Sequence, residues 1–329
     1  MRGLARALVF FSAARGAALA PAERARAAVR AVDAAGAGCG AEARHRAAFY
    51  ALHPEQFWGD EPCRGLVDRI AAAAAADASA GPVVGLDVGA NVGDTLDAVH
   101  RCCGGGAASV VAFECNPRNV PIVEAAAAAR PFSVRVVARA ASDVAGADVA
   151  FDLPGGSDQA GRTFGAETPG NPFGAVRPGE AAAAGAIAVR TTTVDAEVDV
   201  SADVAFAKID VEGHEAAVLR GMASTLARTR VLLVEASDLA RGAGPAPVRD
   251  LAAFFDDRGF DCYRVGFDCL LPLWGAHYHP VYDEFAYWSN VVAVRRGLPF
   301  AADARASADV AGLDPVLDDA LEAESRTRR

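Results

Sequence analysis

The stretch VVGLDVGANVGDT, residues 83–95, decides the fold of this chain. An apolar run ends at Asp87 and breaks into a glycine-containing turn, after which Leu96 and Val99 have the spacing of a helix face. The stretch therefore predicts a strand, a turn and a helix. Gly89 gives the turn a backbone freedom that other residues lack, and the free N–H groups of the new helix face the end of the strand. We expect a small ligand there, although a tight turn without a ligand is the alternative for so short a motif.

The charge of this turn separates two classes of ligand. A dinucleotide-binding turn reads G-x-G-x-x-G and brings bare backbone to a pyrophosphate. This turn instead reads G-x-N-x-G-D from Gly89, with Asp87 and Asp94 flanking it. Carboxylates at these positions would repel a pyrophosphate. They would attract S-adenosylmethionine, which has no phosphate and carries a sulfonium and an ammonium group.

Length and composition indicate one large α/β domain with appendages, because the chain has 329 residues and 52% hydrophobic composition. The net charge of -10 argues against a nucleic-acid partner, which would need a basic face. The seven cysteines are odd in number and include no C-x-x-C pair. They imply neither a disulfide framework nor a zinc site, and we expect them to behave as small apolar residues.

The two ends of the chain differ from the middle. Residues 1–22 contain three arginines, no acid and an apolar run, a pattern typical of a signal or transit peptide, with a frayed amphipathic helix and a cytoplasmic location as the alternative. The run is too short to cross a membrane, and we expect no stable membrane span. Residues 23–80 should form a helical cap. Residues 298–329 are expected to form a polar tail.

The next two predicted strands also end in polar residues. Val110–Phe113 is closed by Glu114, which lies 25 residues after Gly89 (114 − 89), near the spacing at which a doubly wound fold places an acid on a ribose diol. A carboxylate can accept from both ribose hydroxyls, and a solvated strand end is the alternative. A third strand over residues 134–140 is followed by ASD at 141–143, which can bind an adenine edge or cap a helix.

Charged residues crowd the end of another predicted strand, Val204–Ile209. The sequence that follows, DVEGHE at 210–215, places three acids and a histidine together. A helix cap needs only one acid, because negative charge is favourable in the first turn, so this density favours a functional site. Residues 231–234 repeat the pattern of an apolar strand, and this strand ends at Glu235.

Two irregular stretches remain. Residues 154–185 are rich in Gly, Pro, Ser and Thr, which predicts either a mobile flap over a substrate pocket or simple disorder. The aromatic loop at 270–289 contains His277 and His279. This pair could ligate a metal, but two histidines in an aromatic loop are more often surface or pocket residues.

Several motifs follow one another in a recognisable order: LDVGANVGDT, FECNP, ASD, TTTVD, KIDVEGHE with VLRG, LLVE and SNVVAV. Together they resemble the FkbM-type methyltransferase family. The resemblance implies a class I S-adenosylmethionine-dependent domain over residues 81–297. Its α/β fold would be a Rossmann-like, seven-stranded, mostly parallel sheet with an antiparallel last strand and helices on both faces. The implied reaction is O-methylation of a hydroxyl on a small molecule, a sugar or other glycan, or a lipid.

The resemblance also implies roles for individual residues. The acid block places Asp210 first as base or orienter of the acceptor hydroxyl, His214 second, and Glu212 and Glu235 as supports. The sequence demands no metal, although the acids could bind one. The residues implied for the methyl donor are Asp87, Gly89, Asn91 and Gly93 for the methionine moiety, Glu114 for the ribose, and Ser142 and Asp143 for the adenine.

Two departures from the family pattern leave questions open. Cys115 replaces the usual proline of the FEPNP-type motif, and the composition of residues 154–185 is unmatched, which leaves the acceptor undefined. A catalytically inactive cofactor-binding module is the main alternative function. A nicotinamide dehydrogenase is disfavoured because the G-x-G-x-x-G motif is missing.

Overall fold

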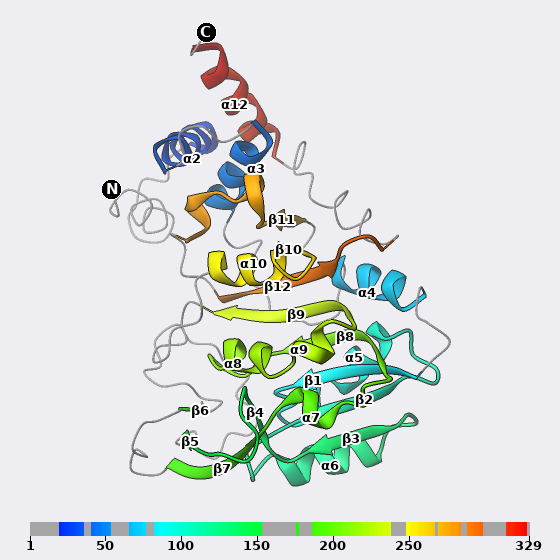
Figure 1. The fold of residues 1–329 in the computed structure, drawn as a ribbon. Coiled ribbons are helices and arrows are strands. Elements are labelled where there is room, and N and C mark those ends of the chain that lie inside the picture. The colour runs from blue at the N-terminus through cyan, green and yellow to red at the C-terminus, as the bar shows by residue number, and fades with distance from the viewer. Residues whose placement is uncertain are drawn as a thin grey trace.

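The computed structural model describes residues 20–35, 41–53, 66–76, 82–152, 176–177, 186–237, 248–266, 269–283, 288–298 and 314–327. Residues 1–19 of the predicted leader (residues 1–22) and nearly all of the predicted flap lie outside these residues. In Figure 1, an open twisted sheet forms the centre of the molecule, a helical cap lies beyond one of its edges, and a small second sheet lies near the other.

The main sheet has the strand order β11-β10-β12-β9-β8-β1-β2-β3. The five strands β9, β8, β1, β2 and β3 run parallel to one another. Strand β12 runs antiparallel to both of its neighbours, β9 and β10. This arrangement confirms the class I methyltransferase fold, and the short strand β11 adds an eighth strand to the expected seven. The strands are β1 (Val83–Val88), β2 (Ser109–Phe113), β3 (Val134–Val137), β8 (Asp203–Ile209), β9 (Thr229–Ser237), β10 (Phe260–Val265), β11 (Leu270–Pro272) and β12 (Trp288–Arg295).

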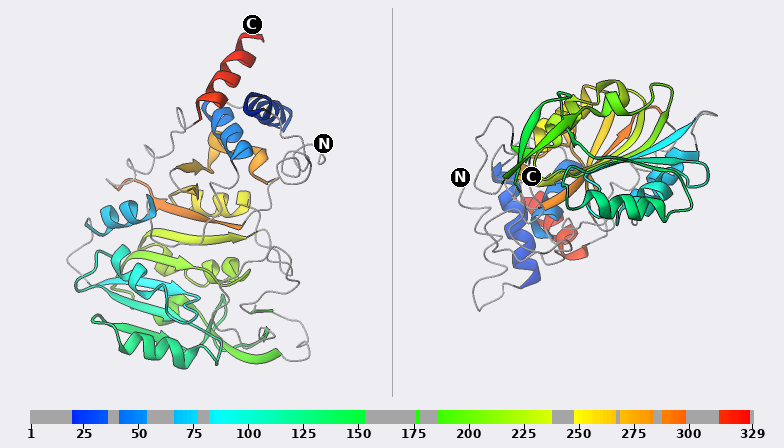
Figure 2. Two further views of the ribbon diagram at one scale, coloured as in Figure 1. Left: turned by 180° about the vertical axis from the view of Figure 1, so that it is seen from behind. Right: turned by 90° about the horizontal axis from the view of Figure 1, so that it is seen from below.

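Helices cover both faces of this sheet, as the two views in Figure 2 show. Strand β9 illustrates why: Val231 and Leu233 belong to one buried cluster, and Leu232 and Val234 belong to the other. Successive side chains of a strand point to opposite faces, so a continuous apolar run requires cover on both. The first cluster includes residues of α4 (Leu66–Ala76), α5 (Leu96–Cys102) and α6 (Val120–Ala128); the second includes residues of α7 (Val194–Glu197), α8 (Glu215–Arg220), α9 (Ala223–Leu226) and α10 (Val248–Asp256).

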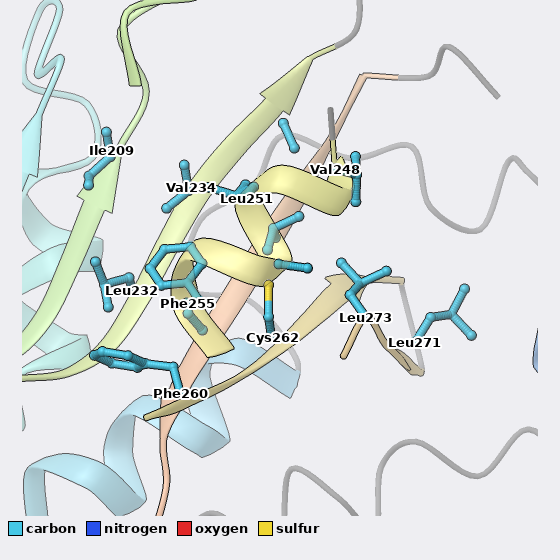
Figure 3. Close-up of a cluster of buried hydrophobic side chains, with 14 of the residues drawn as sticks. Ile209, Leu232, Val234, Val248, Leu251, Phe255, Phe260, Cys262, Leu271 and Leu273 are labelled. Atoms are coloured by element: carbon cyan, nitrogen blue, oxygen red, sulfur yellow. The ribbon is translucent and has the colours of Figure 1, made fainter. Parts of the chain in front are cut away.

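Helix α10 is the centre of the second cluster. Figure 3 shows Phe255 of this helix lying over β9, close to Leu232, with Phe260 of β10 beside it. The rings of Phe255 and Phe260 meet edge to face with their centroids 5.7 Å apart, and both side chains are fully buried. This contact fixes α10 against the sheet.

The small second sheet has the order β4-β7-β5-β6. The expected third strand over residues 134–140 is in fact divided, because β3 pairs with β2 while the next two residues of strand pair with β7. The chain thus leaves the main sheet just before Ser142. The strands of the small sheet are β4 (Ala140–Ala141), β5 (Asp148–Asp152), β6 (Val176–Arg177) and β7 (Ala186–Thr192).

The helical cap joins both ends of the described chain. Helices α2 (Pro21–Ala35) and α3 (Ala41–Leu52) pack with α12 (Pro315–Thr327), which lies in the region where a polar tail was expected. Leu317, Ala320 and Leu321 of α12 are buried at helical spacing. Two pairs add to this packing: His53 Nε2 lies 2.6 Å from Asp314 Oδ2, and His45 Nε2 lies 2.8 Å from Asp318 Oδ1.

The cysteines depart from the expectation in one respect. Cys102, at the end of α5, takes part in a disulfide, whereas Cys103, Cys115, Cys262 and Cys269 are free. A disulfide depends on the distance between two cysteines in the folded chain, which the spacing in the sequence does not give.

None of the helices in the described part of the chain has the length and apolar character needed to cross a bilayer.

Phe255→Ala should lower the free energy of unfolding by about 3–5 kcal/mol, because it removes a fully buried ring between α10 and the sheet. Val200→Ala is the control, since Val200 is 76% exposed and such changes stay within about 0.5 kcal/mol. Urea unfolding monitored by circular dichroism measures both. Equal losses in the two variants would contradict the packing of α10 described above.

Candidate active site

The turn after β1 brings the backbone of two strand ends into contact. Gly89 has a φ of 91°, in the region that favours glycine, and a Cβ added there would lie 1.7 Å from the carbonyl oxygen of Asp210. The N–H groups of Gly89 and Ala90 both donate to the carbonyl of Phe113, at 3.0 and 2.9 Å. The turn is therefore held between the end of β2 and the residue that follows β8.

Glu114 closes β2 and supports the same turn. Its Oε2 accepts from the backbone N–H of Asn91 at 2.8 Å, and its Oε1 accepts from that of Asn116 at 2.7 Å. Burial raises the pKa of Glu114 to about 7, although these two hydrogen bonds oppose the rise and the charge of Asp87 adds to it. Each carboxylate oxygen has a second acceptor position, so the ionised group could still accept from a ribose diol.

Asp87 is fully buried at the end of β1. Its Oδ2 accepts from the Thr95 hydroxyl at 2.7 Å, and its Oδ1 lies 3.8 Å from the ammonium nitrogen of Lys208. Burial raises the pKa of Asp87, and the Lys208 charge and the Thr95 hydrogen bond oppose this rise. In the register of the sheet, Asp87 pairs directly with Lys208 of β8, so the two side chains share one strand end.

Lys208 is a site residue that the sequence reasoning missed. Its Nζ lies 3.0 Å from Asp210 Oδ2 and donates to the carbonyl of Gly89 at 3.4 Å, in addition to its contact with Asp87. One signal could have found it: Lys208 is the only lysine in the chain. The sequence reasoning considered only the neighbouring acids and His214.

Asp210, Glu212 and Glu235 form an acid cluster at the ends of β8 and β9, with one oxygen from each within 4.8 Å of the others. Burial and the neighbouring acids Asp210, Glu212 and Glu215 raise the pKa of Glu235 well above its usual value, and its carboxyl group hydrogen-bonds to Asp210. The spacing would admit a divalent cation. Lys208 supplies positive charge beside this cluster through its 3.0 Å contact with Asp210.

The loop that carries Asp210 and Glu212 has a fixed shape. Glu215, in the first turn of α8, accepts from the N–H groups of Val211 and Gly213 through the same oxygen, at 3.0 and 3.1 Å. Burial raises the pKa of Glu215 to about 6, against the opposing effect of these hydrogen bonds. One acid of the DVEGHE motif thus serves to organise the backbone.

His214, Ser142 and Asp143 form a separate group beside α8. His214 is buried, and its Nε2 lies 3.0 Å from the Ser142 hydroxyl, which also donates to Asp143 Oδ1 at 3.2 Å. Asp143 in turn accepts from Arg220 at 2.9 Å. Burial lowers the pKa of His214, and the nearby Asp143 opposes this change. These contacts connect His214 with the residues predicted for adenine.

These contacts place Asp87, Gly89, Glu114 and Asp210 at the carboxyl ends of the adjacent parallel strands β1, β2 and β8, where ligands bind in open α/β sheets. Ser142 and Asp143 instead follow β4 of the small sheet. The sheet order and the glycine turn together are those of the class I methyltransferase fold. The chain belongs to the FkbM methyltransferase family, because the model of the methyltransferase FkbM domain matches residues 87–262, just over half of its length.

Solved structures show weaker similarity. Methyltransferase FkbM from Methylobacillus flagellatus KT has 13% sequence identity and a TM-score of 0.40, and the match covers 81% of this chain and 58% of that chain. The present chain thus spans less than two thirds of that protein. Precorrin-6y C5,15-methyltransferase from Geobacter metallireducens GS-15 has 10% identity and a TM-score of 0.32, with 73% and 96% covered. No curated protein sequence matches the chain.

Gly89→Ala should weaken binding of S-adenosylhomocysteine, the product of the donor, by at least about tenfold, or 1.4 kcal/mol. The added methyl group would collide with the Asp210 carbonyl and force the turn to move. Gly259→Ala is the matched control, because Gly259 also has a positive φ of 78° but has open space around its Cβ position. It should cost about 1–2 kcal/mol of stability and leave affinity unchanged. Calorimetry measures the affinity, and equal affinity in both variants would contradict this account of the turn.

Glu114 should produce opposite pH dependences of stability and affinity. Its pKa is about 7 in the folded protein and 4.5 in the reference state, so its contribution of roughly 3 kcal/mol is present below pH 4.5 and is lost as the pH rises through about 7. Affinity for S-adenosylhomocysteine should instead rise over the same window, because the ionised carboxylate would accept from both ribose hydroxyls.

Glu114→Gln should remove the Glu114 share of the stability loss and abolish the rise in affinity, since the amide does not titrate. Glu124→Gln is the control, because Glu124 is exposed on α6. Unfolding and calorimetry at pH 5, 6, 7 and 8 provide the two measurements. If the affinity of the wild-type protein does not change with pH, the prediction that Glu114 binds the donor is wrong.

Proposed function

We propose that the protein transfers the methyl group of S-adenosylmethionine to a hydroxyl of a small molecule, a glycan or a lipid, and that Asp210 orients or deprotonates that hydroxyl. The observation that carries this proposal is the position of Asp210. Its carboxylate is 28% exposed at the end of β8, while its backbone carbonyl lies against the Gly89 turn. A group placed there reaches toward both the donor turn and solvent.

The neighbours of Asp210 suit this role. Lys208 and Glu235 both interact with its carboxylate, which limits the directions in which the side chain can turn. A carboxylate has about four acceptor positions, so an acceptor hydroxyl can still donate to it. Glu212 contributes negative charge next to Asp210 and would favour the approach of a sulfonium.

For the donor, we infer that Asp87, Asn91 and the glycines of the turn surround the methionine moiety and that Glu114 binds the ribose. Ser142 and Asp143 would lie near the adenine, and His214 would hold Ser142 in place through their 3.0 Å contact. S-Adenosylmethionine supplies an activated methyl group on a sulfonium. The task of these residues is to align that group with the acceptor oxygen, and alignment is worth roughly 7–11 kcal/mol.

The acceptor class follows from charge. The chain has a net charge of -10, and the proposed acceptor side is lined by carboxylates, so a neutral hydroxyl compound fits better than a polyanion such as a nucleic acid. A methyl donor labelled with deuterium, incubated with the protein and metabolite extracts, would reveal the acceptor by mass spectrometry. Donor binding without any labelled product would favour an inactive cofactor-binding module.

Asp210→Asn should lower single-turnover methyl transfer by roughly 10² or more, because it removes the charge and the proton acceptor while keeping the shape. His214→Gln should cost less, since glutamine can still hydrogen-bond to the Ser142 hydroxyl. Both variants are assayed at saturating donor, with donor affinity measured in parallel. Near-native turnover of Asp210→Asn together with inactive His214→Gln would reverse the two roles and make histidine the base.

A further inference from the structure

Lys208 is unusual in this chain because it is the only lysine. The chain has 32 lysine and arginine residues, and all of them except Lys208 are arginine. In the described residues, every ion pair that a lysine or arginine makes with an acid, apart from those of Lys208, therefore involves an arginine. Some of these pairs lie at the surface, and others are half-buried, such as Arg230 with Asp203. The one lysine is buried at the end of β8, which indicates that this position needs an ammonium group.

The contacts of Lys208 explain why an ammonium is needed. Three oxygens surround its Nζ: Asp210 Oδ2 at 3.0 Å, the Gly89 carbonyl at 3.4 Å and Asp87 Oδ1 at 3.8 Å. An ammonium is a compact charge with three donors that can point at separate acceptors, whereas a guanidinium is a flat fork suited to paired ones. The Lys208 side chain is only 7% exposed, which leaves little room for the larger group.

These three oxygens belong to parts of the site with different tasks. Asp87 and Gly89 form the end of β1 and the donor turn, and Asp210 faces the acceptor. We propose that Lys208 is the positioning residue that couples the two: its ammonium holds the Asp210 carboxylate toward the acceptor while it fixes Asp87 and Gly89 around the donor. This inference rests on the proposed function for the role of Asp210.

The physical reason is charge balance in a confined space. Without the ammonium, the fully buried carboxylate of Asp87 would keep the Thr95 hydroxyl as its hydrogen-bond donor among the described side chains. Asp210 would lose its opposite charge. A buried charge without its partner is strongly unfavourable. We expect Asp210 to turn toward solvent and the Gly89 turn to relax, so that donor and acceptor are no longer aligned.

The first test uses the single lysine as a probe in the intact protein. Protein produced with ¹³Cε-lysine gives one lysine carbon signal, that of Lys208. S-Adenosylhomocysteine should shift this signal, and so should Asp210→Asn, whereas Asp203→Asn at the opposite end of β8 should not. A signal that stays unmoved at donor-product concentrations shown by calorimetry to saturate the site would overturn the proposal. This test does not require the acceptor.

The second test compares variants of Lys208 in single-turnover methyl transfer. Lys208→Met should lower turnover by roughly 10². Lys208→Arg should regain less than about a tenth of the turnover that Lys208→Met loses. Added methylammonium should partly restore the turnover of Lys208→Ala. Arg230→Met is the matched control, because it removes a cation from a half-buried ion pair on β9 away from the site; its turnover per folded molecule should match that of the wild type.

The outcomes separate the two proposals. If Lys208→Met loses turnover while Asp210→Asn retains it, the role of Asp210 in the proposed function fails and the link from Lys208 to the donor turn stands. If Lys208→Met or Lys208→Arg retains wild-type turnover, the coupling role of Lys208 is wrong whatever Asp210 does. Should Lys208→Met fail to fold, Lys208→Arg and the lysine signal of the unmodified chain still decide.

Discussion

The absence of a side chain at Gly89 is the constraint on which the rest of the site depends. Only a bare backbone can lie this close to the Asp210 carbonyl, and this approach brings the ends of β1 and β8 to the same point. The register then pairs Asp87 with Lys208. The Gly89 turn, the buried Asp87 and Lys208, and the half-buried carboxylate of Asp210 thus become one structure, although more than a hundred residues of chain separate Asp87 from Lys208.

The site contains more acids than it has cations, and each acid is stabilised in its own way. Glu114 and Glu215 accept from backbone N–H groups, the pKa of Glu235 is raised by burial and by the neighbouring acids, and Asp87 uses the Thr95 hydroxyl and the Lys208 ammonium. Fixed donors of this kind need no reorganisation when charge moves during a reaction. What remains is a region of negative potential at the strand ends, which suits a positively charged methyl donor.

The sequence was informative where a feature is local. The strand, glycine turn and helix at residues 83–102 follow from periodicity and turn chemistry, and the FkbM motifs in their order led to the correct family and sheet. Features that arise from contacts distant in the sequence were missed. Lys208 acquires its role only through the register of β1 and β8, and the disulfide of Cys102 depends on folded distances.

Shorter signals failed for a related reason. Helix α12 buries few large apolar side chains, chiefly Leu317 and Leu321, so its composition resembles that of a polar tail. The division of the third strand into β3 and β4 reflects a change of pairing partner, from β2 to β7, which no pattern within that stretch reveals. The contact of His214 with Ser142 is likewise a tertiary one, across 72 residues.

The position of α12 also has a consequence for folding during synthesis of the protein. Chains emerge from the ribosome amino end first, and domains begin to fold as they appear. Helix α2 packs with α12, and Val29 and Val32 of α2 are buried in the folded protein. Helix α12 cannot cover α2 until residues 315–327 have been translated. A chain released before α12 is made would therefore expose this apolar surface of α2, and chaperones and proteases could recognise it.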